Sequence, residues 1–107
     1  MNTELDRLEE EIKKDFEALP KEMQSYFQEE TLEPNEILNG NYQKFPISKK
    51  AGIINRAEVK VRKTYQNNDD LIRAQAYLLS VAQYFTEKAN SKAKQTLSSL
   101  MAVEEEA

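Results

Sequence analysis

No proline and no glycine interrupts the chain between Asp69 and Met101. A segment this long without either residue favours a single α-helix, because these are the two residues that break helices most often. At 1.5 Å per residue, a helix of about thirty residues would be roughly 45 Å long. That is longer than the helices a compact domain of this size normally contains. The far half is therefore expected to protrude, to bend back after Asn90 and Ser91, or to pack against a second copy of the chain.

The rest of the chain also favours helices. It has only two glycines and three prolines among 107 residues, which provides few of the turns that a β-sandwich or a doubly wound sheet needs. A hydrophobic fraction of 39% and a charged fraction of 32% suit helices that each expose a wide polar face. A chain of this length forms one domain with a modest core. We therefore predict an all-α fold, a small bundle of four to five helices with a long C-terminal helix.

Apolar residues recur at helical spacing through the first forty positions. Thr3 is the expected cap of a first helix, and Pro20 ends that helix and opens a second one. Residues 33–40 are predicted to form one short helical turn that stops at Gly40. The apolar stripe of the first helix has members three or four positions apart: Leu5, Leu8, Ile12, Phe16 and Leu19.

A connector and a further helix are predicted before the long helix. This further helix begins either at Ser48, which places Gly52 in its first turn, or at Asn55, and the longer version is preferred. The asparagine and aspartate residues at 67–70 then cap the long helix. Apolar residues are so frequent at positions 71–85 that the long helix is expected to lie at the centre of the bundle.

Charge is unevenly distributed along the chain. The first forty residues carry twelve acidic and four basic side chains, a net charge of −8, whereas the next twenty-six carry seven basic and one acidic, a net charge of +6. The remainder has a net charge of −2. We divide the single domain, 1–107, into an acidic helical region (1–40), a basic connector and helix (41–66), a long helix (69–101) and an acidic, solvent-exposed tail (102–107).

Catalytic side chains are scarce. The chain has no histidine and no cysteine, and so lacks the commonest general base, the commonest thiol nucleophile and the thiolate ligands of zinc. The carboxylates at 9–11 and 29–30 are expected on solvated helix faces. Neither glycine belongs to a phosphate-binding loop, and residues 67–70 lack the spacing of a calcium loop. We expect no enzymatic activity, no metal and no cofactor.

The chain shows no recognisable targeting signal. Its first residues are acidic and lack the basic and apolar regions of a secretory signal. The longest apolar runs are four residues, at 76–79 and 100–103, which is too short for a membrane span. The absence of cysteine fits a reducing compartment. We expect a soluble, cytoplasmic protein without a membrane association.

The basic band at 44–63 has three possible partners: a polyanion, an acidic protein, or the acidic helices of the same chain. Arg56, Lys60 and Lys63 are four and three positions apart, so they share one helix face. Solvation, or pairing with the chain's own acidic helices, is the preferred interpretation, because charge runs usually mark solvated faces. The candidate nucleic-acid-binding residues combine cations with aromatic rings: Lys49, Lys50, Arg56, Lys60, Lys63, Tyr42 and Phe45.

A second group of candidates lies in the far half of the long helix, where small residues permit a close approach of another helix. Residues 77–85, which include Tyr77 and Tyr84, are instead expected in the core. Our hypothesis is a non-enzymatic helical protein–protein interaction or regulatory module, a homo-oligomer that associates through its long C-terminal helix. The alternative is a nucleic-acid-binding protein. The candidate partner-binding residues are Ala89, Ala93, Leu97, Leu100 and Met101.

Overall fold

The computed structural model describes the backbone of residues 3–106 and the side chains of residues 4–91. Within this range all regular structure is helical, and no strand occurs. The predicted all-α fold with a long C-terminal helix is therefore confirmed. The elements are α1 (Thr3–Glu17), α2 (Lys21–Glu29), α3 (Pro34–Leu38), a 3₁₀ turn η1 (Asn41–Lys44), α4 (Ile47–Thr64) and α5 (Asn68–Glu106).

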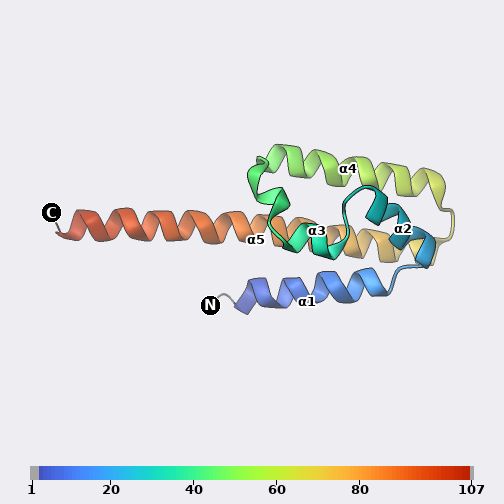
Figure 1. Ribbon diagram of the computed structural model, residues 1–107, viewed down its shortest axis with the longest axis horizontal. Coiled ribbons are helices and arrows are strands. Elements are labelled where there is room, and N and C mark those ends of the chain that lie inside the picture. Colours follow the sequence, from blue (N-terminus) through green and yellow to red (C-terminus); the bar gives the residue numbers. More distant parts are fainter. Residues whose placement is uncertain (1–2, 107) are drawn as a thin grey trace.

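The long helix α5 is the centre of the molecule, as its dense apolar pattern predicts (Figure 1). α1 packs along one side of α5 and α4 along another, whereas α3 contacts α1 and η1. The C-terminal part of α5 extends beyond all the other helices, so the molecule measures 60 × 24 × 21 Å. Of the three expected arrangements, bending back is wrong, because α5 is helical through Asn90 and Ser91.

The predicted end of the long helix at residue 101 is wrong. α5 does not end near Met101 but continues to Glu106. Alanine and glutamate are strong helix formers, and nothing in this stretch breaks the helix. The run of glutamates at 104–106, which suggested that the helix had already ended, is therefore part of α5.

Local chemistry explains where the helices begin and end. The side-chain oxygen of Asn67 accepts hydrogen bonds from the backbone N–H groups of Asp69 (2.9 Å) and Asp70 (3.2 Å), which confirms the predicted cap of α5. Gly40 follows α3 with a φ of +92°, a left-handed conformation that glycine adopts without strain. The longer version of α4 is confirmed, although Pro46 rather than Ser48 precedes its first turn.

Aromatic rings fill the centre of the core. Tyr77 of α5 lies between Phe16 of α1 and Phe27 of α2, with ring centroids 5.5 Å and 5.2 Å away. Apolar side chains from α1, α2 and α4 belong to the same core cluster. Of the range 77–85 expected in the core, Tyr77, Tyr84 and Phe85 are buried, whereas Leu79 is exposed. In the described part of the chain, no helix combines the length and the apolar character that crossing a bilayer requires.

Candidate interaction surfaces

One face of α5 exposes large apolar side chains to solvent. Ile72 and Leu79 are 62% and 59% exposed, although both belong to the dense apolar pattern that suggested burial. Ala74, Tyr77 and Val81, on another face of the same helix, are completely buried. The core therefore covers one side of α5 and leaves a second apolar side uncovered.

The spacing of Ile72 and Leu79 continues in the sequence towards the C-terminal end of α5. Steps of seven residues lead from Ile72 and Leu79 to Thr86, Ala93 and Leu100. Seven residues are almost two full helical turns, so these positions follow one stripe that winds by only about 20° per step. We call the positions 72, 79, 86, 93 and 100 the α5 stripe.

The predicted partner-binding residues occupy positions 89–101 of α5. Ala89 is partly buried. Beside the stripe, Ile47 and Ile54 of α4 and Ala82 of α5 line a small hollow of about 70 Å³. The remaining candidates lie outside the residues whose side chains the structure describes: Ala93, Leu97, Leu100 and Met101.

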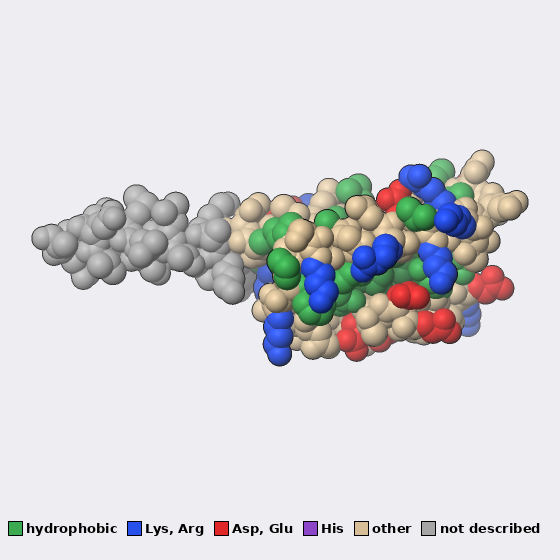
Figure 2. Space-filling model, turned by 90° about the horizontal axis from the view of Figure 1, so that it is seen from above, with side chains coloured by type: hydrophobic (Ala, Val, Ile, Leu, Met, Phe, Trp, Pro, Cys, Tyr) green, Lys and Arg blue, Asp and Glu red, His purple; other side chains and the backbone are tan. Residues whose placement is uncertain are grey.

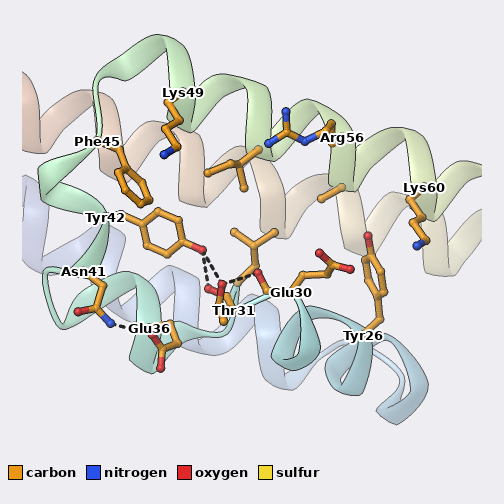
Figure 3. Close-up of a pocket in the computed structure, with 13 residues that line it drawn as sticks. Tyr26, Glu30, Thr31, Glu36, Asn41, Tyr42, Phe45, Lys49, Arg56 and Lys60 are labelled. Carbon is orange, nitrogen blue, oxygen red and sulfur yellow. Dashed lines mark hydrogen bonds between the residues drawn. The ribbon is translucent and has the colours of Figure 1, made fainter.

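The basic band lies beside a groove on another part of the surface. Three of its cations, Lys49, Arg56 and Lys60, line one wall of a groove of about 570 Å³ (Figure 3). Residues of α2, α3 and η1 form the opposite wall, which includes Glu30 and Glu36. In Figure 2 a row of Lys and Arg side chains borders an apolar band, with acidic side chains beyond it. We call the groove between these two walls, which Lys49, Arg56 and Lys60 line on one side, the α4 groove.

Other candidates in the basic band do not belong to the groove's cationic wall. Lys50 is buried, and its amine lies 5.1 Å from the ring centroid of Phe85 in the core. Lys63 is exposed on α4 but does not line the groove. Lys50 lies on a different face of α4 from Lys49, Arg56 and Lys60, whereas Lys63 shares their face but lies beyond the residues that line the groove.

The two aromatic candidates contribute to packing. Tyr42 is buried, and its hydroxyl donates a hydrogen bond to the backbone carbonyl of Thr31 (2.6 Å). Its ring lies 5.5 Å from Phe85 and 5.8 Å from Phe45. Phe45 is partly exposed, and the amine of Lys49 lies 4.0 Å from its ring centroid. Tyr42 therefore offers no open ring face on which a base would stack.

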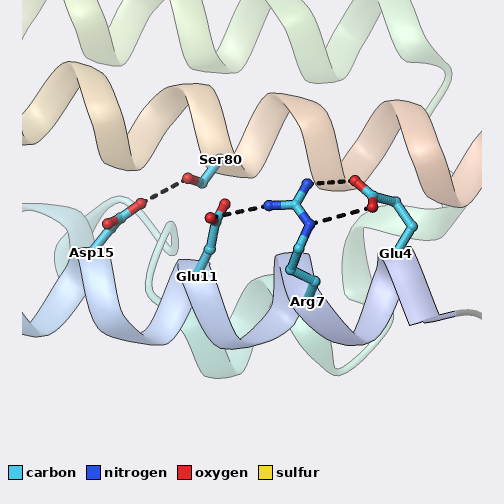
Figure 4. Close-up of polar contacts among 5 residues, drawn as sticks. All are labelled: Glu4, Arg7, Glu11, Asp15 and Ser80. Carbon is cyan, nitrogen blue, oxygen red and sulfur yellow. Dashed lines mark hydrogen bonds and ion pairs between the residues drawn. The ribbon is translucent and has the colours of Figure 1, made fainter.

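The acidic helices do not neutralise the basic wall. On α1, Arg7 lies between Glu4 and Glu11 and pairs with both, and its hydrogen bond lowers the pKa of Glu4 (Figure 4). On α4, Arg62 pairs with Glu58 on the same helix. Among the described residues, no ion pair within 4 Å joins α4 to α1, α2 or α3. The expected pairing between the basic band and the acidic region is therefore not seen in this range.

Several residues of these surfaces were not predicted as sites. Tyr26, Glu30 and Ile53 line the α4 groove, but no local pattern links them, because they come from different elements. Ile72 and Leu79 did carry a signal, namely their spacing of seven in register with Leu100. Helical spacing alone does not show which of two apolar faces the core will cover.

No family model, no curated protein and no solved structure matches this chain. Within the residues that the structure describes, no group of three or more acidic side chains is arranged to hold a metal ion. The functional inference therefore depends on the α5 stripe and the α4 groove.

Proposed function

We propose that this protein is a non-enzymatic interaction module that self-associates through α5. The observation that carries the proposal is that α5 exposes Ile72 and Leu79, which share a seven-residue spacing with Ala93 and Leu100. The same helix also extends beyond the rest of the domain (Figure 1). A stripe of this kind is the pattern along which two helices pack.

A second copy of the chain is the partner that fits this stripe best. Seven-residue steps wind slowly around a helix, and two such helices cross at roughly 20° and supercoil so that their stripes stay in contact. Because both copies carry the same stripe, a two-fold axis places the stripe of one copy against the stripe of the other. From position 72 to position 100 the contact would run about 42 Å.

The energetic gain comes from covering the exposed apolar groups. Complete burial of a leucine or isoleucine side chain is worth about 1.5–3 kcal/mol, so the uncovered parts of Ile72 and Leu79 favour association in each copy. The hollow beside Ala82 offers additional apolar surface at the edge of the same stripe. Thr86 and Ala93 are small or polar. In the proposed dimer they determine how closely the two helices approach and contribute little to the free energy of association.

Light scattering of the full chain during size-exclusion chromatography tests the proposal. At tens of micromolar we expect a dimer, and Leu79→Glu and Leu100→Glu should each shift it towards the monomer because a charge then lies in the apolar contact. Val59→Glu is the matched control, since Val59 is also 50% exposed but lies on α4. A wild-type chain that is strictly monomeric, or a dimer that survives both substitutions, would contradict self-association through α5.

Nucleic-acid binding receives less support from the geometry. The groove that gathers Lys49, Arg56 and Lys60 also contains Glu30 and Glu36, whose charges repel phosphates. Tyr42 and Lys50 are buried. Binding of this kind would still be recognised by its steep salt dependence, with a log–log slope near −3 if about three phosphates were neutralised.

A further inference from the structure

We propose that the α4 groove binds an acidic amphipathic helix of a partner protein, with the partner's carboxylates along α4. This inference does not depend on self-association, because the groove and the α5 stripe lie on different elements. It follows from the shape of the groove, from the state of its cations and from the arrangement of charge across it.

The groove has the size and lining of a binding site. Its volume of about 570 Å³ falls within the roughly 300–1,000 Å³ typical of ligand pockets. Leu32 and Ala57 form a buried apolar floor, and Ile53 and Phe45 are partly exposed above it. Along α4, the distance from Lys49 to Lys60 is about 16 Å, which is the length of three helical turns.

The cations of the groove are positioned but not neutralised. Lys49 lies over the ring of Phe45, and the amine of Lys60 is 6.0 Å from the ring centroid of Tyr26. Among the described residues, no carboxylate lies within 4 Å of Lys49, Arg56 or Lys60 in an ion pair. Aromatic rings therefore hold two of the positive charges at the edge of an apolar surface, where they remain available to an external carboxylate.

The opposite wall determines the orientation of the occupant. Glu30 follows the last residue of α2, Glu36 belongs to α3, and both line the groove. Glu36 accepts a hydrogen bond from the side-chain amide of Asn41 (2.8 Å; Figure 3). A ligand that is negative on all sides, such as a nucleic acid, meets repulsion from this wall. A ligand with carboxylates on one edge, apolar groups in the middle and a neutral or cationic opposite edge meets complementary charge on both walls.

An amphipathic helix presents this combination of edges. Its apolar residues at i, i+3, i+4 and i+7 would cover Ile53 and Phe45, while acidic residues beside them would reach Arg56 and Lys60. The groove lies alongside α4 for about three turns, which matches one short helix laid next to it. We therefore assign the groove to helix recognition.

Selection from a displayed library of random peptides of about sixteen residues, long enough for four helical turns, tests this assignment on the full chain. We expect enriched peptides to combine at least two Asp or Glu residues with apolar residues at helical spacing. Amide chemical shifts should change along α4 and η1 when such a peptide binds. In fluorescence anisotropy, Arg56→Glu and Lys60→Glu should each weaken binding by roughly tenfold, and added salt should weaken it further.

Lys63→Glu is the matched control, because Lys63 is an exposed lysine of α4 that does not line the groove. It should change peptide binding little. The proposal fails if no peptide is enriched, if enriched peptides lack an acidic bias, or if Arg56→Glu binds them as well as the wild type. Tight, salt-dependent binding of duplex DNA or RNA that Arg56→Glu abolishes would assign the groove to nucleic acid instead.

The peptide result is separable from the dimer result. The variant Leu79→Glu, expected to be monomeric, should retain peptide affinity, since Leu79 does not line the groove. Peptide binding lost together with dimerisation would show that the groove is completed by the second copy, and would overturn its assignment as an independent site.

Discussion

The hydroxyl of Tyr77 donates a hydrogen bond to the backbone carbonyl of Leu32, which lies 45 positions earlier in the chain. Tyr77 is completely buried in the middle of α5, and Leu32 lies in the short connection between α2 and α3. The bond therefore attaches this connection to the central helix. It also satisfies a buried carbonyl that would otherwise lack a partner in the core.

The first prediction concerns this bond. Tyr77→Phe keeps the ring between Phe16 and Phe27 but leaves the Leu32 carbonyl unpaired, so we expect a loss of about 1–3 kcal/mol in the free energy of unfolding. Urea denaturation measures the change. Tyr65→Phe is the control, because Tyr65 is only partly buried, and it should change stability by less than about 0.5 kcal/mol. Equal effects of the two substitutions would contradict a special role for the buried bond.

The second prediction concerns alkaline pH. Burial raises the pKa of Tyr77 far above its usual value, with smaller contributions from Glu33 and Tyr42, and burial also raises the pKa of Tyr84. Below about pH 10 both hydroxyls are protonated in the folded and the unfolded chain, so these groups do not make stability depend on pH. Above about pH 10 tyrosines ionise in the unfolded chain while the raised pKa of Tyr77 keeps it protonated in the folded chain, and stability must fall.

Thermal unfolding between about pH 8 and pH 12 measures this loss, which approaches about 1.4 kcal/mol per pH unit for Tyr77. Tyr77→Phe removes one of the ionising groups, so its stability should decline less steeply than that of the wild type. A flat profile above pH 10, or identical slopes for the two proteins, would show that Tyr77 titrates normally in the fold.

The third prediction concerns the contact between α1 and α5. The hydroxyl of Ser80, a buried residue, donates a hydrogen bond to the carboxylate of Asp15 at 2.7 Å (Figure 4). A double-mutant cycle with Ser80→Ala and Asp15→Ala should give a coupling of about 0.5–3 kcal/mol, because the bond is partly shielded from water. The exposed pair of Arg7 and Glu11 serves as the comparison and should give a smaller coupling, because solvent screens both charges.

The fourth prediction uses the two glycines as a matched pair. Gly40 has a φ of +92°, where a side chain is strained, so Gly40→Ala should destabilise the protein by about 1 kcal/mol or more. Gly52 lies inside α4, and an added Cβ would meet only the end of the Arg56 side chain at 3.7 Å. Gly52→Ala should therefore stabilise the protein by about 0.5–1 kcal/mol. Chemical denaturation of both variants checks the opposite signs.

Sequence alone determined the helical class and most helix boundaries, because these depend on neighbours a few positions apart. The spacing of Leu8, Ile12 and Phe16 requires one apolar face, Gly40 stops α3 by its own conformation, and Asn67 caps α5 with its own side chain. The length of α5 followed from the absence of breaking residues. Its continuation to Glu106 was missed because an acidic composition was taken as the end of the helix.

Only the tertiary structure decided which apolar and charged residues face solvent. Ile72 and Ala74 are two positions apart in the same pattern, yet α1 and α4 cover only one side of α5, so Ile72 is exposed and Ala74 is buried. The α4 groove likewise joins Glu30 to Arg56, which are distant in the sequence. Local preferences determine that a helix forms, but the faces it exposes depend on where the other helices pack.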